Sequence, residues 1–236
     1  MLRLPLEGVR EGETRLCDAA ARYVARVHRL TVGDRLTVFD PRSRLEADAE
    51  IIAVRSTDVR VRIEPPREAT NVPATSVSVI QTIGKGTKMD DVVRDATELG
   101  ATRVIVGIGE RSVRLPHARL RERLERVAVE AARQCGRGDV PTIVGPVPLG
   151  DALEAARGEA LRILLQPGAE RRLGEVLANH PSGTAVVLVI GPEGGFSDAE
   201  RTKAGALGYV STSLGHFVMR TETACAAALG AIAARG

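Results

Sequence analysis

Two short segments near the carboxyl end of the chain hold the residues whose types and spacing could do chemistry. GPEGGFSDAE, residues 191–200, places Glu193 among glycines, and LGHFVMRTETA, residues 214–224, contains Arg220 and Glu222. Glycine lets backbone amides and carbonyls approach a ligand closely. Arginine stays protonated and can stabilise negative charge, whereas a carboxylate can accept a proton. The two segments indicate a ligand site with charged groups beside it.

The residues of the first segment exclude the common nucleotide-binding loops. A phosphate loop requires GxxxxGK[ST], and no lysine or Ser/Thr occupies those places here. The dinucleotide fingerprint GxGxxG is also absent, and Glu193 would repel a pyrophosphate. S-adenosyl-L-methionine carries a sulfonium, an ammonium and an apolar adenine, and it has no phosphate. The segment therefore favours this molecule as the cofactor.

A third segment, LLQPGA at residues 164–169, is also an apolar run that ends in a glycine turn. In open α/β sheets, ligands bind at the carboxyl ends of the strands. We therefore expect the three segments to follow three strands and to meet over one pocket. An ordinary turn between a strand and a helix is the alternative for each segment taken alone.

The elements that must position these segments alternate between strand and helix from about residue 76 onward. Ser197 and Glu200 have the spacing of a capping box at a helix start. Apolar strands that alternate with helices indicate an α/β fold with a parallel sheet covered on both faces. The predicted strands are 76–83, 103–108, 161–166, 185–190 and 209–214, and the other predicted helices are 89–99, 117–134, 170–179 and 221–234.

The amino-terminal part has a different pattern, with one helix and several short strands. Apolar residues recur at helical spacing over 17–30, and strands are predicted at 36–39, 49–54 and 59–64. These elements within one short region suggest a small β-barrel. Residues 65–75, PPREATNVPAT, contain three prolines and no periodicity, and they predict a linker between two domains.

The composition bears on the partner of the protein. The net charge is only +3, but 30 of the 33 basic residues are arginine. Arginine binds phosphates with two hydrogen bonds, which fits a polyanion such as RNA. A genome rich in arginine codons, together with surface salt bridges, explains the same count equally well. The five aromatic residues, none of them tryptophan, argue against a platform that stacks single-stranded bases.

The cysteine, histidine and apolar residues indicate whether the protein binds a metal and where in the cell it is located. Cys17, Cys135 and Cys225 are odd in number and form no CxxC, so we expect buried or half-buried thiols without disulfides. The four histidines have no HExxH spacing, and we expect no metal. The apolar run 224–234 is too short to span a bilayer, and the first residues lack the apolar core of a signal peptide. We expect a cytoplasmic protein without membrane contact.

Several ordered segments also resemble a known family. GPEGGFSDAE followed about twenty residues later by LGHFVMRTETA resembles the signature of the ribosomal RNA small subunit methyltransferase E family. This family comprises the N3-methyluridine methyltransferases of 16S rRNA in the knotted SPOUT class. Further similar segments occur in the expected order: RYVARVHRLTVGDRLTVFD (22–40), GKGTKMD (84–90), ATELGA (96–101) and RQCGRGDVPTI (133–143).

The resemblance implies an architecture and a reaction. Residues 1–70 would form a PUA-like β-barrel that binds RNA. Residues 73–236 would form a SPOUT domain, with a Rossmann-like parallel sheet and a C-terminal trefoil knot, an exception to the usual absence of knots. The protein would be a homodimer with its site near the dimer interface. The reaction would be S-adenosyl-L-methionine-dependent N3-methylation of one uridine in the decoding region of 16S rRNA, in the small ribosomal subunit.

The resemblance also implies which residues form the site. The catalytic candidates are Arg220, Glu222 and Glu193. The cofactor would lie against Leu165, Gln166, Pro167, Ile190, Gly191, Gly194, Gly195, Leu214, Gly215, Met219 and Thr221, largely through backbone groups. The candidates for contact with RNA phosphates are Arg29, Lys85, Lys88, Arg111 and Arg137, and a solvated surface charge is the alternative for each.

The roles of the charged candidates follow from the chemistry of uridine. Loss of the N3 proton places negative charge on O2 and O4, and Arg220 is predicted to stabilise it, by roughly 3 kcal/mol. A salt bridge from Arg220 to Glu222 or Glu193 is the alternative. The sequence leaves four candidates for the group that accepts the N3 proton: Glu193, Glu222, water and His216. Of these, His216 is expected to face solvent, because it is a loop residue. Thr221 could instead cap the last helix.

The chain departs from the usual pattern of the family at four positions. Arg22 replaces a common histidine, and Arg133 replaces a common glutamate. His216 and Phe217 stand where a small residue and an arginine are usual. The core of the segment, Arg220 to Thr223, is unaffected.

Other functions are alternatives on the sequence alone. A related knotted enzyme could act on another base or on a ribose hydroxyl, but the Asn- and Arg-rich motif of the ribose methylators is not found. A non-catalytic RNA-binding or assembly factor would not need the intact glycine turns and the RTET segment. A phosphate-dependent nucleotide enzyme is disfavoured by the lysine-free turns.

Overall fold

The computed structural model describes residues 1–55, 58–84, 89–112, 118–156, 158 and 161–235. The chain forms two compact units. Unit 1 comprises Met1–Val72 and Ala132–Val140, and unit 2 comprises Pro73–Ala131 and Pro141–Gly236. The amino-terminal residues therefore fold together with a short segment that lies much later in the sequence.

Over its described residues, unit 1 forms one six-stranded sheet, in the order β1-β3-β4-β5-β2 with β6 paired to β4. The β1–β3 pair is parallel and the other pairs are antiparallel. No ladder between described residues joins the end strands β1 and β2, so a closed barrel is not found. The strands are β1 (Arg3–Pro5), β2 (Gly12–Arg15), β3 (Arg35–Phe39), β4 (Leu45–Arg55), β5 (Asp58–Ile63) and β6 (Arg67–Glu68).

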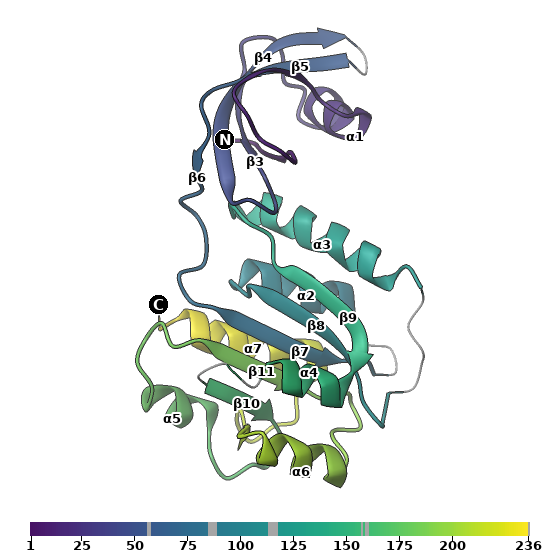
Figure 1. Ribbon diagram of the computed structural model, residues 1–236, viewed down its shortest axis with the longest axis vertical. Helices are drawn as coiled ribbons and strands as arrows, with labels where there is room; N and C mark the ends of the chain where they lie inside the picture. The colour runs from purple at the N-terminus through teal and green to yellow at the C-terminus, as the bar shows by residue number, and fades with distance from the viewer. Residues whose placement is uncertain (56–57, 85–88, 113–117, 157, 159–160, 236) are drawn as a thin grey trace. The chain divides into compact units, whose positions relative to one another are not determined.

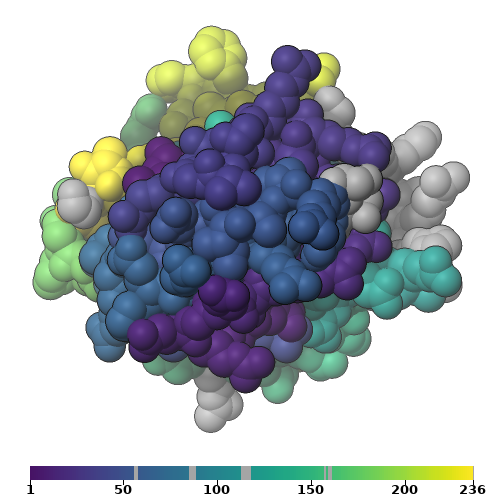
Figure 2. Space-filling model, turned by 90° about the horizontal axis from the view of Figure 1, so that it is seen from above, coloured from purple at the N-terminus to yellow at the C-terminus, as the bar shows by residue number. Residues whose placement is uncertain are grey.

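The helix of unit 1 packs against this sheet. It consists of α1 (Asp18–Arg22), which continues into a π-helical turn, η1 (Tyr23–Val27). Ala21 and Val24 are buried with apolar residues of β3, β4 and β5 in one core. Figure 2 shows the amino-terminal residues in purple and blue, with stretches from different parts of this sequence side by side on the surface. The helix predicted over 17–30 is confirmed for residues 18–27, of which the second half is π-helical.

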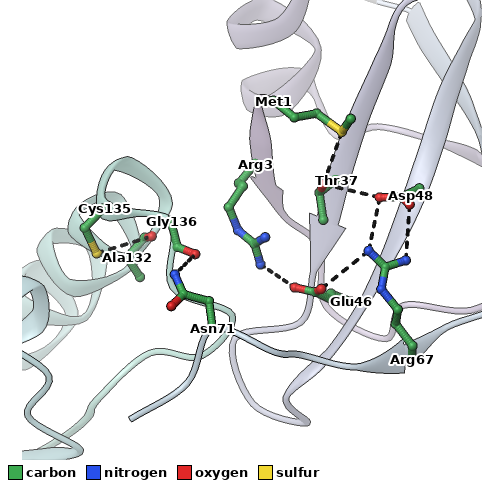
Figure 3. Close-up of polar contacts among 10 residues, drawn as sticks. All are labelled: Met1, Arg3, Thr37, Glu46, Asp48, Arg67, Asn71, Ala132, Cys135 and Gly136. Carbon is green, nitrogen blue, oxygen red and sulfur yellow. Dashed lines mark hydrogen bonds and ion pairs between the residues drawn. The ribbon is translucent and has the colours of Figure 1, made fainter. Parts of the chain in front are cut away.

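A buried carboxylate connects three strands of unit 1 (Figure 3). Glu46 of β4, 3% exposed, accepts a hydrogen bond of 2.6 Å from Arg3 of β1 and lies 3.4 Å from Nη2 of Arg67 in β6. Arg67 also donates two hydrogen bonds, of 3.2 and 3.3 Å, to Asp48. These bonds and the charge of Arg67 hold the pKa of Asp48 below its usual value. Arg67, in the segment expected to be a linker, is therefore part of the sheet.

The later segment of unit 1 is held by the same region. The side-chain amide of Asn71 donates to the carbonyl of Gly136 at 2.7 Å (Figure 3). The guanidinium of Arg133 lies over the ring of Tyr23, 3.5 Å from its centroid. Arg133 therefore makes a cation–π contact inside unit 1.

The described residues of unit 2 form a six-stranded sheet in the order β12-β10-β11-β7-β8-β9, in which the neighbouring strands are parallel. The central strand β7 is buried along its whole length. The predicted parallel α/β sheet is confirmed. The strands are β7 (Val77–Thr82), β8 (Arg103–Ile108), β9 (Thr142–Pro148), β10 (Leu161–Leu165), β11 (Val186–Ile190) and β12 (Val210–Thr212).

Helices cover both faces of this sheet (Figure 1). Leu153 of α4 (Leu149–Ala155) and Ala204 of α6 (Asp198–Ala206) share a hydrophobic core with Val187 and Val189 of β11. Helices α2 (Met89–Glu98) and α7 (Thr221–Ala233) pack against each other, and α7 also contacts β11. The capping box is confirmed, because the hydroxyl of Ser197 accepts from the amide at the third position of α6. The helices are α2 (Met89–Glu98), α3 (Leu120–Cys135), α4 (Leu149–Ala155), α5 (Leu173–Ala178), α6 (Asp198–Ala206) and α7 (Thr221–Ala233).

Two further expectations concern thiols and membranes. Cys225 is buried and Cys135 is half-buried, but Cys17 is exposed, because it precedes α1 at the surface of unit 1. The expectation of burial was therefore wrong for Cys17. Within the described ranges, none of the helices combines the length and the apolar character needed to cross a membrane.

Replacing Glu46 with glutamine should destabilise unit 1. The change removes the negative charge that faces Arg3, whose side chain is only 16% exposed. Loss of one partner of a buried ion pair lowers the free energy of unfolding by about 3 kcal/mol. Glu13→Gln is the matched control. Both side chains of the Glu13–Arg62 pair are exposed, so this pair should contribute less than about 1 kcal/mol to the free energy of unfolding. Chemical denaturation measures both free energies of unfolding. Equal losses would contradict the structural role of Glu46.

Candidate functional site

The three glycine-containing segments line a cavity of about 490 Å³ in unit 2. This volume lies within the range of small-molecule sites. Every residue predicted to contact the cofactor lines the cavity. These residues are Leu165, Gln166 and Pro167 at the end of β10 and after it, Ile190, Gly191, Gly194 and Gly195 at the end of β11 and after it, and Leu214, Gly215, Met219 and Thr221 from the segment after β12 to the first residue of α7.

Strand register builds the floor of the cavity. Leu165 of β10 pairs with Ile190 of β11 on one side and with Thr212 of β12 on the other. Residues in register on parallel strands point to the same face of the sheet, and all three residues are buried and line the cavity. The floor is therefore apolar except for one hydroxyl. The sequence prediction missed Thr212, because a polar residue in a short edge strand carries no local signal of burial.

The turn after β11 needs glycine at two positions. Gly195 adopts a φ of 68°, in the left-handed region, and its amide donates to the carbonyl of Pro192 at 2.8 Å. A Cβ added at Gly191 would lie 3.1 Å from the ring of Phe196. The backbone of this turn can therefore face a ligand without side chains of its own at these positions.

A second turn, which follows β8, is hydrogen-bonded to the turn after β11 and to the start of α6. The carboxylate of Glu200 accepts from the amide of Glu110 at 2.8 Å and from the amide of Ser197 at 2.8 Å. Arg111 lines the cavity and donates to the carbonyl of Gly194. Arg111, predicted to contact RNA phosphates, is thus also a structural neighbour of the cavity.

Arg220 differs from the other arginines at the cavity. Arg111 is engaged by the carbonyl of Gly194, and Arg201 donates to the carbonyl of Phe196 at 2.7 Å. Arg220 is exposed and lines the cavity, and no hydrogen bond or ion pair of its guanidinium is found in the described part of the chain. The alternative of a salt bridge to Glu222 or Glu193 is therefore not observed, and the guanidinium is free to meet a ligand.

The two candidate carboxylates are placed differently. Glu193 is exposed and lines the cavity. Glu222 lies outside the lining, and its carboxylate accepts a hydrogen bond of 3.4 Å from the hydroxyl of Thr221. The N-cap of α7 is Arg220, without a side-chain capping bond, so the alternative of Thr221 as the cap was wrong.

The segment between β12 and α7 carries the exposed residues of the site. His216 is exposed, and its Nε2 lies 3.3 Å from Nη2 of Arg172, which confirms the expectation that it faces solvent. Phe217 and Val218 also line the cavity, and Phe217 is 84% exposed. All five aromatic residues are described, and Phe217 is the exposed one among them.

The remaining RNA candidates have separate placements. Arg29 is exposed in unit 1, with a φ of 55°. Arg137 is 5% exposed, and its guanidinium forms an ion pair of 2.8 Å with the buried carboxylate of Asp139. Arg137 therefore presents no surface cation, contrary to the prediction, because its own neighbour neutralises it inside unit 1. Lys85 and Lys88 lie outside the described residues.

The thiol of Cys225 lies next to the cavity but is deeply buried. Burial raises the pKa of Cys225 to about 12, so this residue, next to the cavity-lining Ala224, stays a neutral thiol. Among the residues that the structure describes, no group of three or more His, Cys, Asp or Glu side chains is placed to hold a metal ion.

Comparison with known proteins identifies the class and then the family. A parallel α/β sheet with a ligand-sized cavity at the ends of its last strands is typical of an α/β enzyme, and residues 71–233 match the RNA methyltransferase domain family. Ribosomal RNA small subunit methyltransferase E of Synechocystis sp. is 31% identical over 96% of this chain and 74% of its own. The Bacillus subtilis protein of the same name is 29% identical over 89% and 85%. The chain belongs to the ribosomal RNA small subunit methyltransferase E family.

Solved structures have the same fold. A methyltransferase of Legionella pneumophila in complex with its cofactor S-adenosylmethionine has a TM-score of 0.87 and 31% identity, covering 99% of this chain and 97% of its own. Ribosomal RNA small subunit methyltransferase E of Neisseria gonorrhoeae bound to S-adenosylmethionine has a TM-score of 0.88 and 28% identity, with coverages of 98% and 96%.

Alanine at Gly195 should strain the glycine turn. Its φ of 68° is unfavourable for residues with a Cβ, so Gly195→Ala should lower the free energy of unfolding by about 1–2 kcal/mol. Gly174→Ala in α5 is the control, because its added Cβ meets open space and removal of a helical glycine stabilises by about 0.5–1 kcal/mol. The two variants should shift the thermal midpoint in opposite directions. A stabilised Gly195→Ala protein would contradict the need for glycine in this turn.

Proposed function

We propose that this protein transfers a methyl group from S-adenosyl-L-methionine to N3 of one uridine in the decoding region of 16S rRNA. The names of its relatives support a small-subunit ribosomal RNA substrate, and two similar structures contain S-adenosylmethionine. One observation carries the proposal most directly: three glycine-containing segments surround one cavity, and beside it lies the guanidinium of Arg220, which has no ion pair within the described residues.

The cavity fits the cofactor by its chemistry as well as by its volume. The apolar side chains of Leu165 and Ile190 suit an adenine ring, and the turn after β11 offers backbone groups rather than a lysine. Glu193 in the lining favours a ligand with positive charge over a phosphate. S-adenosyl-L-methionine, when bound, supplies an electrophilic methyl group.

The residues around the cavity then prepare the nucleophile. Methyl transfer is an in-line displacement, so the segments must hold the uridine base in line with the methyl group. Arg220 places a permanent positive charge against O2 and O4, which become negative when N3 loses its proton. Glu193, which lines the cavity, accepts this proton in preference to Glu222, which lies outside the lining.

The family resemblance extends the proposal to the architecture. The three segments at the ends of β10, β11 and β12 belong to a C-terminal trefoil knot of a SPOUT domain over residues 73–236. Residues 1–70 act as a PUA-like RNA-binding domain, to which exposed Arg29 contributes a phosphate contact. The protein works in the cytoplasm as a homodimer. The exposed Phe217 and Val218 at the cavity support a partner or substrate there.

Deletion of the gene tests the reaction directly. Mass spectrometry of the small-subunit RNA should lose N3-methyluridine, and reverse transcriptase should no longer stop at the modified position. The wild-type gene should restore both signals. If the mark persists in the deletion strain, the assigned reaction is wrong.

Arg220→Ala tests the proposed role of the guanidinium. The variant should bind S-adenosylhomocysteine within a few-fold of wild type by calorimetry, while turnover should fall about 100-fold, because transition-state charge loses its stabilising cation. Arg94→Ala is a control, because Arg94 is an exposed arginine of α2 that pairs with Asp91 away from the cavity. Unchanged turnover in Arg220→Ala would remove this residue from the mechanism.

A further inference from the structure

Thr212 is a buried polar residue in the floor of the cavity. It ends strand β12, is 0% exposed and lines the cavity. Its backbone carbonyl accepts from the amide of Gln166 at 2.8 Å, but its side-chain hydroxyl has no hydrogen-bond partner among the described residues. Buried hydroxyl groups are normally satisfied, because an unpaired one destabilises the folded protein. In a residue that lines a cavity, such a hydroxyl can be satisfied by a bound ligand.

The position of this hydroxyl in the floor indicates which part of a ligand it meets. Ile190, Leu165 and Thr212 form a row across three adjacent strands, in register and on one face of the sheet. The first two side chains are apolar and suit the flat face of a purine. The hydroxyl of Thr212 ends the row, where the polar edge of a nucleoside would lie. A hydroxyl can donate and accept, so it can pair with either kind of group on that edge.

The charged groups of the cavity are on other segments. Arg220, Glu193 and Arg111 come from the turns and the segment before α7, whereas the floor has no charged residue. The floor therefore offers no charged partner to the ammonium or the carboxylate of an amino-acid ligand. The uncharged nucleoside is matched by the floor.

A second buried polar atom is found at the other end of the same row. Oε1 of Gln81 has no partner among the described residues, and Gln81 is in register with Ile190. Gln81 is not part of the cavity lining, however, so its side chain is not offered to a ligand. Thr212 therefore combines a hydroxyl without a partner among the described residues with a place in the cavity lining.

We infer that the hydroxyl of Thr212 hydrogen-bonds the adenosine half of the cofactor, so that this chain recognises its cofactor through a side chain as well as through its backbone. The inference rests on the proposed function, because it takes S-adenosyl-L-methionine as the ligand of the cavity.

The test removes the hydroxyl without changing the shape of the side chain. Thr212→Val should weaken binding of S-adenosylhomocysteine and of 5′-methylthioadenosine by the same factor, roughly 3- to 10-fold in calorimetry, because both ligands share the adenosine half. Thr212→Ser keeps the hydroxyl and should bind within about 2-fold of wild type. Ser211→Ala, an exposed neighbour on the same strand, should bind as wild type does.

The ligand-free protein provides an independent measurement. If the hydroxyl has no partner until the ligand binds, Thr212→Val should leave the thermal midpoint unchanged or raise it. A lowered midpoint would show a structural role for the hydroxyl and overturn the inference.

The binding outcomes separate the inference from the proposed function. Unchanged affinity of Thr212→Val for both ligands overturns the inference and leaves the proposed function intact. A loss confined to S-adenosylhomocysteine overturns the assignment to the adenosine half. Failure of the wild-type protein to bind S-adenosylhomocysteine would overturn the proposed function and the inference together.

Discussion

The in-register pairing of β10, β11 and β12 is the constraint on which the site depends. Parallel strands in register end at the same level, so the segments that follow them leave the sheet side by side. Hydrogen bonds to backbone carbonyls hold these ends: the side-chain hydroxyl of Thr82 donates to the carbonyl of Ile190 at 3.0 Å, and the backbone amide of Gln166 donates to the carbonyl of Thr212 at 2.8 Å. The cavity is the space that the three segments enclose. A slip of one strand would turn its floor residue to the opposite face.

The arginines of this chain serve different physical purposes, which their number does not reveal. Arg3 and Arg67 neutralise the buried carboxylate of Glu46, and Arg111 holds the carbonyl of Gly194. Each of these guanidinium groups satisfies a protein acceptor, so it stabilises the fold around it. Arg220 is exposed at the cavity and has no such acceptor within the described residues, which leaves its charge for a ligand. An arginine-rich composition is therefore compatible with both explanations that the sequence left open.

The secondary structure was predictable where the pattern was long and local. The buried strands of unit 2 and the capping box of Ser197 follow from apolar runs and side-chain spacing. Strand β9 and helix α4 were not predicted, because Gly145 and Pro146 interrupt the apolar pattern of residues 142–148. The short strands β1, β2 and β6 were also missed, because they are stabilised by pairing with distant strands rather than by their own residues.

The sequence by itself determined the glycine turns, the apolar strands before them and the types of charged residue that follow, because these depend on local backbone preference and spacing. Burial was decided only by the tertiary structure. Neither the burial of Arg137, nor the exposure of Phe217, nor the lack of a hydrogen-bond partner for the Thr212 hydroxyl among the described residues can be read from neighbouring residues. The physical reason is that the environment of a side chain is set by the segments packed around it, and for these residues most of those segments are far away in the chain.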